Sequence, residues 1–111
     1  METFTKGDIV LYHFPFTDLS RRKLRPCLVL SDVMGKDILL CQITSKRIKK
    51  DGYVVEIDKS ETKEGSLMLD SYIRCNMIFT ASTTQIQKKI CKIPKKVYLE
   101  VVMKINKVII F

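Results

Sequence analysis

The apolar and polar positions of the first eighty residues form short alternating runs that predict β-strands. Runs rich in β-branched and aromatic residues cover residues 9–16, 26–31, 37–44 and 53–58. Two more strands are expected over residues 66–70 and 72–79, although Asp70-Ser71 would also fit a bend within one long strand. Because Asp, Ser and Gly separate the runs as tight turns require, the pattern predicts a small β-barrel.

From Pro94 onward the apolar period changes to that of an α-helix. Apolar residues recur at intervals of three and four and would line one face: Tyr98, Val101, Val102, Ile105, Val108 and Ile109. Pro94 is suited to the start of this helix, where a missing N–H costs nothing. The 111 residues leave room for one domain. We therefore expect residues 1–111 to form a single mainly β domain with a C-terminal helix packed on it.

The charge of the chain indicates a polyanionic partner. Lys and Arg number 20 against 12 Asp and Glu, which gives a net charge of +8. The basic residues cluster in residues 21–25, 46–50 and 88–96. If the strand-end clusters converge on one rim of the barrel, they form a positive groove for a nucleic-acid backbone. The alternative is a solvated surface that only keeps the protein soluble.

Several classes of function are disfavoured by what the sequence lacks. No apolar stretch has the length of a spanning helix or the layout of a signal peptide, so we expect a cytoplasmic protein without a membrane partner. The four widely spaced cysteines and the single histidine do not match a metal site, and we expect buried, reduced thiols and no metal. His13 sits in a predicted strand, where a structural or surface role is favoured over a catalytic one. Any catalysis must then use Arg, Thr, Ser or carboxylates.

Three segments follow one another along the chain: "KGDIVLYHFPFTDLSRRKLRPCLVLSD", "ILLCQITS" and "SYIRCN". Their order resembles the MazF/PemK family of toxin–antitoxin ribonucleases. The resemblance includes Gly7-Asp8 in the first strand, Arg25-Pro26 opening a strand, Ile43-Thr44-Ser45 closing the next, and Ile73-Arg74. Membership would imply an SH3-like barrel, a homodimer, and growth inhibition by cleavage of single-stranded mRNA at short sequences without a cofactor. It would also imply a cognate antitoxin with an acidic segment, which fits the positive charge.

The resemblance also implies roles for individual residues. Arg25 matches the catalytic arginine of the family, Thr44 a threonine beside it, and Arg74 an arginine of the PemK-like branch. The reaction would be attack of the ribose 2′-hydroxyl on the adjacent phosphorus, giving a cyclic phosphate, with Arg25 chiefly stabilising the phosphorane. RNA-binding residues are expected in the loops and strand ends: Asp18, Ser20, Arg22, Lys23, Ser45, Lys46, Arg47 and Asn76. The alternatives are a surface salt bridge for Arg25, an ordinary strand residue for Thr44, and a structural arginine at the dimer interface for Arg74.

The sequence departs from the PemK-like pattern at two points. Asn76 stands where that branch has an aspartate, and an amide cannot accept a proton at neutral pH. The histidine that some members have in the loop after the first strand is also absent, which leaves Asp18 as a substitute base. A second hypothesis is therefore a catalytically weakened member that binds RNA or antitoxin without cleaving. A third, a CcdB-like gyrase poison, is disfavoured because such toxins use a tryptophan-containing tail and this chain has no Trp.

Overall fold

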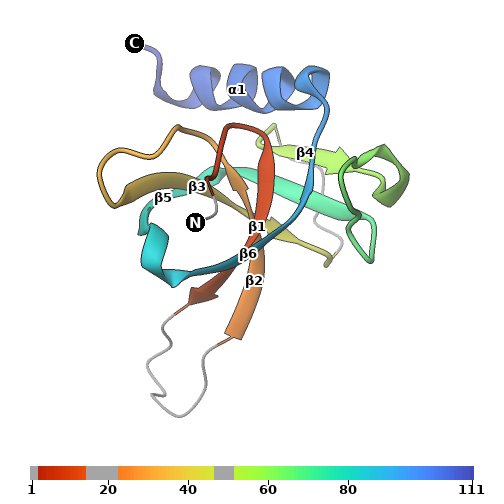
Figure 1. Cartoon of the computed structure of the whole chain (residues 1–111). Helices are drawn as coiled ribbons and strands as arrows, with labels where there is room; N and C mark the ends of the chain where they lie inside the picture. The colour runs from red at the N-terminus through yellow and green to blue at the C-terminus, as the bar shows by residue number, and fades with distance from the viewer. Residues whose placement is uncertain (1–2, 15–22, 47–51) are drawn as a thin grey trace.

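The computed structural model describes residues 3–14, 23–46 and 52–111, and these form one mainly antiparallel sheet with a C-terminal helix (Figure 1). The strands are β1 Asp8–Phe14, β2 Lys23–Val29, β3 Asp37–Thr44, β4 Val54–Ile57, β5 Ser71–Ser82 and β6 Ile86–Lys92. Short 3₁₀ turns, η1 Lys59–Glu61 and η2 Thr83–Gln85, follow β4 and β5, and the helix α1 spans Lys95–Ile109. The expected fold class is confirmed.

The strand order of the sheet is β4-β5-β3-β2-β1-β6, and every neighbouring pair is antiparallel. β2 and β3 are joined through a turn in which the backbone groups of Met34 and Asp37 hydrogen-bond to each other in both directions. Gly35 in this turn has a φ of 68°, which a glycine adopts without strain. The tight turn expected between the runs at residues 26–31 and 37–44 is thus confirmed.

The two edge strands are linked by the segment between η1 and β5. Lys63 forms an isolated antiparallel bridge to Lys92 of β6, with both backbone N–H···O distances at 2.8 Å. Gly65 makes the approach possible, because a side-chain carbon there would overlap the carbonyl oxygen of Ile90. Its φ of 127° is also one that other residues rarely adopt. The bridge brings β6 against the segment that follows β4 and so curls the sheet toward a barrel.

Apolar side chains cover both faces of the curled sheet. One cluster, which includes Ile9, Leu28 and Ile73, packs against α1 through Val97 and Val101. The other, which includes Val10, Val29 and Leu40, lies on the opposite face and is extended by the contacting rings of Tyr12, Phe14 and Phe79. Alternate residues of β1 and β3 enter alternate clusters, as the two-residue period of a strand requires.

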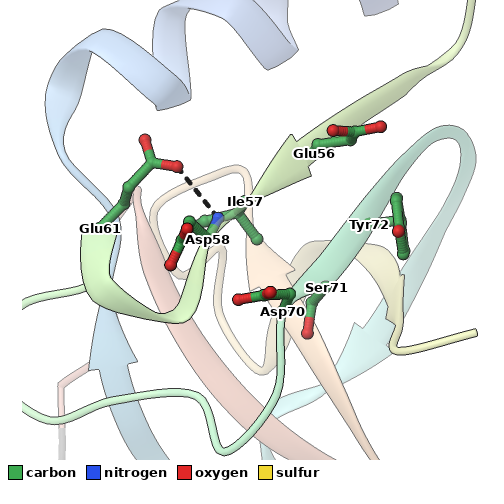
Figure 2. A pocket seen from close by; sticks show the side chains of 7 residues that line it. All are labelled: Glu56, Ile57, Asp58, Glu61, Asp70, Ser71 and Tyr72. Carbon is green, nitrogen blue, oxygen red and sulfur yellow. Dashed lines mark hydrogen bonds between the residues drawn. The ribbon is translucent and has the colours of Figure 1, made fainter. Parts of the chain in front are cut away.

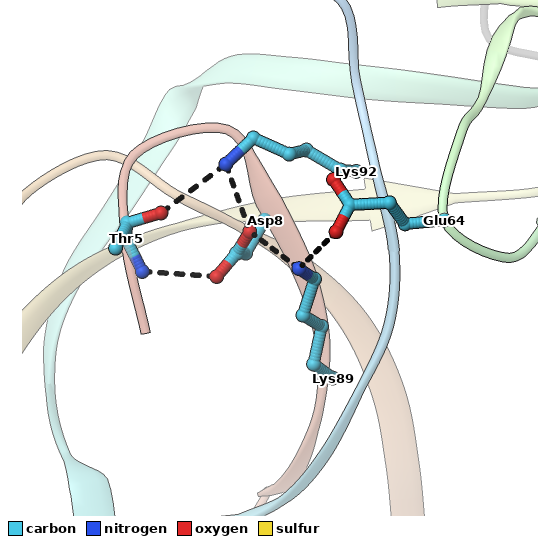
Figure 3. A network of polar contacts seen from close by, with 5 residues as sticks. All are labelled: Thr5, Asp8, Glu64, Lys89 and Lys92. Carbon is cyan, nitrogen blue, oxygen red and sulfur yellow. Dashed lines mark hydrogen bonds and ion pairs between the residues drawn. The ribbon is translucent and has the colours of Figure 1, made fainter. Parts of the chain in front are cut away.

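A buried carboxylate joins the start of β1 to β6 (Figure 3). Asp8 is 1% exposed, and its Oδ2 accepts a hydrogen bond from the Thr5 N–H at 2.9 Å. Its Oδ1 lies 3.3 Å from the ammonium groups of both Lys89 and Lys92. Glu64 pairs with Lys89 on the outer side, also at 3.3 Å. Burial alone would lower the pKa of Lys89, but Asp8 and then Glu64 outweigh it and raise that pKa.

The sequence prediction is wrong in three places among the described residues. Residues 66–70 form no strand, because Gly65 turns the chain and Leu67 is the one buried side chain of the run. β6 was not predicted, because its exposed lysines were interpreted only as part of a basic cluster, whereas lysines are common on edge strands. The strand around Arg25 begins at Lys23, so Arg25-Pro26 lies inside β2 and does not open it.

The C-terminal helix is confirmed, but its buried face is rotated from the predicted one. Val97 and Val101 are its buried residues, and Tyr98 and Ile105 are half-buried. Three residues of the predicted stripe are exposed instead: Val102, Val108 and Ile109. α1 contacts β4 and β5 and lies across one side of the sheet (Figure 1). Its buried residues fall in its first two turns, and its last turn is exposed. Within the described ranges, no helix is both long and apolar enough to cross a membrane.

Candidate active site

A row of polar and aromatic side chains crosses five strands on one face of the sheet. Tyr12 of β1 pairs with Arg25 of β2, Thr44 of β3 pairs with Tyr72 of β5, and Tyr72 pairs with Glu56 of β4. Pairing between β2 and β3 ends at Cys27 and Gln42, and the same register continued by two residues sets Arg25 opposite Thr44. Partners in antiparallel strands project to the same face. We call these five residues the cross-sheet row: Tyr12, Arg25, Thr44, Tyr72 and Glu56.

The row lies at the border of the apolar cluster opposite α1. Tyr12 belongs to that cluster and is 8% exposed, whereas Arg25, Thr44 and Tyr72 are half-buried and Glu56 is exposed. A half-buried arginine is restrained along its stem but still reaches solvent with its guanidinium. Because Pro26 fixes its own φ and restricts the residue before it to extended backbone, the direction of Arg25 is also constrained.

The hydroxyl of Thr44 is oriented by the backbone that follows it. Thr44 Oγ1 accepts a hydrogen bond from the Lys46 N–H at 3.1 Å, where the chain leaves β3. A hydroxyl has one proton to donate in addition to its acceptor sites, so the proton of Thr44 stays available for a bound oxygen. Ser45 and Lys46 are exposed beside it, as RNA-contacting residues must be.

Arg74 continues the same face of β5. The residues at 71, 73 and 75 are buried, while Tyr72 and Arg74 between them are half-buried, so these two share the outer face. Asn76 is exposed and lies where the pairing of β5 with β3 is irregular, since Ile73 pairs with Ile43 but Ile78 pairs with Cys41. Arg74 pairs with Val54 of β4 and lies two residues from Tyr72. Lys23 is exposed and lies two residues before Arg25, which sets both cations on one face of β2. The sheet thus gathers predicted site residues that are about fifty positions apart in sequence.

Four of the predicted RNA-binding residues lie outside the described part of the chain: Asp18, Ser20, Arg22 and Arg47. Three residues of the row were not predicted from the sequence: Tyr12, Tyr72 and Glu56. Strand periodicity alone could have set Tyr12 and Tyr72 on one face of their strands, but their neighbourhood with Arg25 and Thr44 depends on the register between strands.

An acidic pocket of about 360 Å³ adjoins the β4 end of the row (Figure 2). Its lining includes Glu56, Asp58, Glu61 and Asp70, with Tyr72 at one side. Two of these carboxylates hold the local backbone: Asp58 and Glu61 form a reciprocal capping box around η1. The backbone N–H of Ser60, and then its hydroxyl, lowers the pKa of Asp58. This end of the row repels phosphate, so an RNA backbone is better accommodated toward Arg25 and Thr44.

The remaining candidates from the sequence have structural surroundings. All four cysteines are buried and reduced, as predicted. Burial raises the pKa of Cys27 to about 12 and that of Cys91 to about 11, and it also raises the pKa of Cys41. His13 is half-buried opposite Leu24, and its Nδ1 has no hydrogen-bond partner among the described residues. In the same part of the chain, no group of three or more His, Cys, Asp or Glu side chains could hold a metal ion.

Solved structures share this fold at low sequence identity. A MazE–MazF crystal structure from Deinococcus radiodurans matches with a TM-score of 0.80 and 18% identity, covering 96% of this chain and 96% of that one. The Mycobacterium tuberculosis toxin MazF-mt6 matches with a TM-score of 0.72 and 15% identity, covering 90% and 93%. An endoribonuclease in complex with its cognate antitoxin, from a mycobacterial species, matches at 0.71 and 12%, covering 94% and 92%.

Comparison with family sequence models gives the more specific result. A search among curated protein sequences found no match. The model described as "PemK-like, MazF-like toxin of type II toxin-antitoxin system" matches residues 5–109. Since that match spans nearly the whole sheet and helix described above, the chain belongs to the PemK-like, MazF-like toxin family of type II toxin–antitoxin systems.

Proposed function

We propose that this protein is an endoribonuclease toxin that cleaves single-stranded mRNA without a metal ion. The observation that supports this most is the β2–β3 register, which ends at Cys27 and Gln42 and directs Arg25 and Thr44, two residues further along each strand, toward each other, with Arg74 two residues from Tyr72, the partner of Thr44. The family match and the fold shared with solved endoribonucleases support the same activity. A cytoplasmic location follows from the proposed substrate.

The reaction we infer uses the substrate's own nucleophile. The 2′-oxygen forms a bond to the adjacent phosphorus, the bond from phosphorus to the 5′-oxygen breaks, and a 2′,3′-cyclic phosphate remains. Arg25 stabilises the extra negative charge on the phosphorane, because a guanidinium can bind two phosphate oxygens at once. Thr44 donates its hydroxyl proton to a phosphate oxygen, and Arg74 supplies a second positive charge. The 2′ proton is lost to a base and the departing 5′-oxygen gains a proton, so that atoms and charge balance.

Tyr72 of the cross-sheet row suits single-stranded RNA. Unpaired bases stack on aromatic rings, and each stacked base contributes about 1–3 kcal/mol to binding. Tyr72 is half-buried beside Thr44, so its exposed part is available to a base next to the cleaved phosphate. DNA would bind to the same surface but would not be cleaved, because it lacks the 2′-hydroxyl. Cleavage at a short sequence would follow from contacts that flank the row.

Asn76 supports a second candidate function. It lies exposed in β5, two residues after Arg74, where the PemK-like branch has an aspartate. An amide cannot take the 2′ proton, so Asn76 is not the general base. If no other group takes that proton, the protein is a weakened member that binds RNA or its antitoxin without cleaving. In that case the Asn76→Asp variant is expected to gain cleavage that the wild type lacks.

We infer that an acidic antitoxin segment and a second copy of the chain are the protein partners. Structures of relatives have been solved in complex with MazE or a cognate antitoxin. The net charge of +8 favours an acidic segment over the basic side of the row. The outer face of α1 exposes large apolar side chains that a second copy would cover: Leu99, Val102, Met103 and Ile109. A Met103→Glu variant is expected to shift the protein from dimer to monomer in light scattering.

The direct test is cleavage of a mixed-sequence single-stranded RNA in the presence of EDTA. The wild type is expected to give discrete fragments that end in cyclic phosphates, and Arg25→Ala is expected to give none while its circular dichroism spectrum stays native. Lys36→Ala is the matched control, since Lys36 is an exposed cation in the β2–β3 turn, remote from the row. Equal cleavage by Arg25→Ala and wild type would overturn the proposal.

A further inference from the structure

A second pocket lies between the N-terminal segment, the bridge at Lys63 and the start of α1. Its volume is about 310 Å³, and its lining consists of Lys6, Gly7, Lys63, Lys92, Ile93, Lys95 and Tyr98. The pocket and the cross-sheet row lie at opposite ends of β1. Gly7 and Lys92 lie at the Asp8 end of the β1–β6 pair, whereas Arg25 pairs with Tyr12 near the other end of β1. It is also on the side of the sheet that α1 covers, opposite the row.

The four lysines of this pocket are only partly compensated by nearby carboxylates. The Lys6 ammonium pairs with Asp32 at 3.5 Å, but the two side chains are 55% and 71% exposed, so an anion can displace this contact at little cost. Asp8 compensates Lys92 but is shared with Lys89. Lys63 and Lys95 form no ion pair within 4 Å with any other described residue.

The donors of Lys92 leave room for one more acceptor. An ammonium group has three N–H donors. Two of those of Lys92 are directed to Thr5 Oγ1 at 3.2 Å and Asp8 Oδ1 at 3.3 Å. The ammonium is thus held at the pocket by a buried carboxylate, and it can still donate to a bound oxygen. The buried charge that stabilises the β1–β6 pair therefore also orients a cation of the pocket.

The floor of the pocket is apolar. Ile93 is buried, and the Tyr98 hydroxyl donates to the Leu30 carbonyl oxygen at 2.7 Å, so the ring is fixed and its hydroxyl is already engaged. A side-chain carbon at Gly7 would only touch this floor, at 3.9 Å from both Ile93 Cγ1 and Lys92 Cε, and it is the φ of 92° that favours glycine at this position. An apolar floor under a ring of ammonium groups fits an anion that is attached to a less polar group.

We propose that this pocket is a phosphate-binding site separate from the active site, which takes the phosphate of a nucleotide or of an RNA chain. Phosphate is favoured over a lone carboxylate because its three or four oxygens can accept from several ammonium groups at once. A phosphate ester also places a sugar against Ile93 and the Tyr98 ring. The site would bind a free nucleotide whether or not the protein cleaves RNA. Only an RNA occupant would rest on the proposed function.

The test uses the Arg25→Ala protein, so that RNA stays intact, and follows backbone amide NMR signals at constant ionic strength. Titration with inorganic phosphate and with uridine 5′-monophosphate is expected to shift the amides of Gly7, Ile93 and Lys95 saturably. A Lys63→Ala/Lys95→Ala variant is expected to bind about tenfold more weakly. The matched control is Lys36→Ala/Lys88→Ala, which removes the same charge from exposed positions outside the pocket and is expected to bind as before.

A short single-stranded RNA distinguishes the two sources of the phosphate, an RNA chain and a free nucleotide. If the chain supplies it, the Lys63→Ala/Lys95→Ala variant binds RNA more weakly, and its slope of log affinity against log salt falls by about 0.7 for each lost phosphate contact. If RNA binding is unchanged while uridine 5′-monophosphate still shifts the pocket amides, the site takes a free nucleotide. The proposal is overturned if phosphate shifts none of these amides, or if both double variants weaken binding equally. It is also overturned if only an acidic peptide shifts them.

Discussion

Replacement of the buried Asp8 by asparagine is expected to destabilise the fold substantially. The carboxylate is 1% exposed and faces two ammonium groups at 3.3 Å, whose side chains are 26% and 27% exposed. Removal of one partner from a buried ion pair costs about 3–5 kcal/mol, because the remaining charge is left without compensation. The lysines here can recover part of their hydration, and asparagine keeps an oxygen for the Thr5 N–H. We therefore expect the free energy of unfolding to fall by about 2–3 kcal/mol.

The assay is urea denaturation of wild type and variant at equal protein concentration, since dimerisation would add to stability. Asp32→Asn is the matched control, because Asp32 also pairs with a lysine, at 3.5 Å, but both side chains are largely exposed. That variant is expected to lose less than about 0.5 kcal/mol. A loss below about 1 kcal/mol for Asp8→Asn, or equal losses for the two variants, would refute the argument that the buried carboxylate stabilises the β1–β6 pair.

Three other predictions concern the bridge, the thiols and Thr44. Gly65→Ala is expected to cost more than about 2 kcal/mol in thermal unfolding, because of overlap with Ile90 and an unfavourable φ, whereas Gly52→Ala, with open space around it, is expected to cost less than about 1 kcal/mol. The native thiols are expected to resist Ellman's reagent at pH 8 until urea is added, and stability should fall as pH rises above about 8.5, because thiols ionise in the unfolded chain while Cys27 and Cys91 stay protonated in the fold. Rapid labelling of the native protein would contradict this. Thr44→Val is expected to slow RNA cleavage about 10²-fold with little change in RNA affinity, and equal rates would remove Thr44 from the mechanism.

The periodicity of the sequence predicted most of the fold because five of the six strands and the helix bury side chains at regular intervals. Residues 37–44 match β3 at both ends, because the turn on its N-terminal side is specified by Gly35. β6 does not bury side chains at regular intervals. Its lysines are exposed at an edge or paired with Asp8, and only Cys91 is fully buried. An edge strand of this composition has no local signal and is determined by its partner β1.

The candidate site was predictable in its strongest residues and not in its geometry. Arg25, Thr44 and Arg74 were found through their resemblance to a family pattern. Their neighbourhood depends on strand register, which is fixed by contacts between strands far apart in sequence. The same holds for Tyr72, which becomes part of the site only because it pairs with Thr44. The second pocket could not be predicted from the sequence for the same reason, since Lys6, Lys63 and Lys95 come together only in the folded chain.

The central claim is that the ribose 2′-hydroxyl at the cleaved position is the nucleophile. The measurement that tests it most directly compares an RNA oligonucleotide containing the mapped cleavage sequence with the same oligonucleotide bearing one 2′-deoxy residue at that position. The account predicts that both bind with similar affinity and that the deoxy substitution abolishes cleavage at that bond. Continued cleavage of the deoxy-substituted bond would contradict the account, because a water molecule would then have to be the nucleophile.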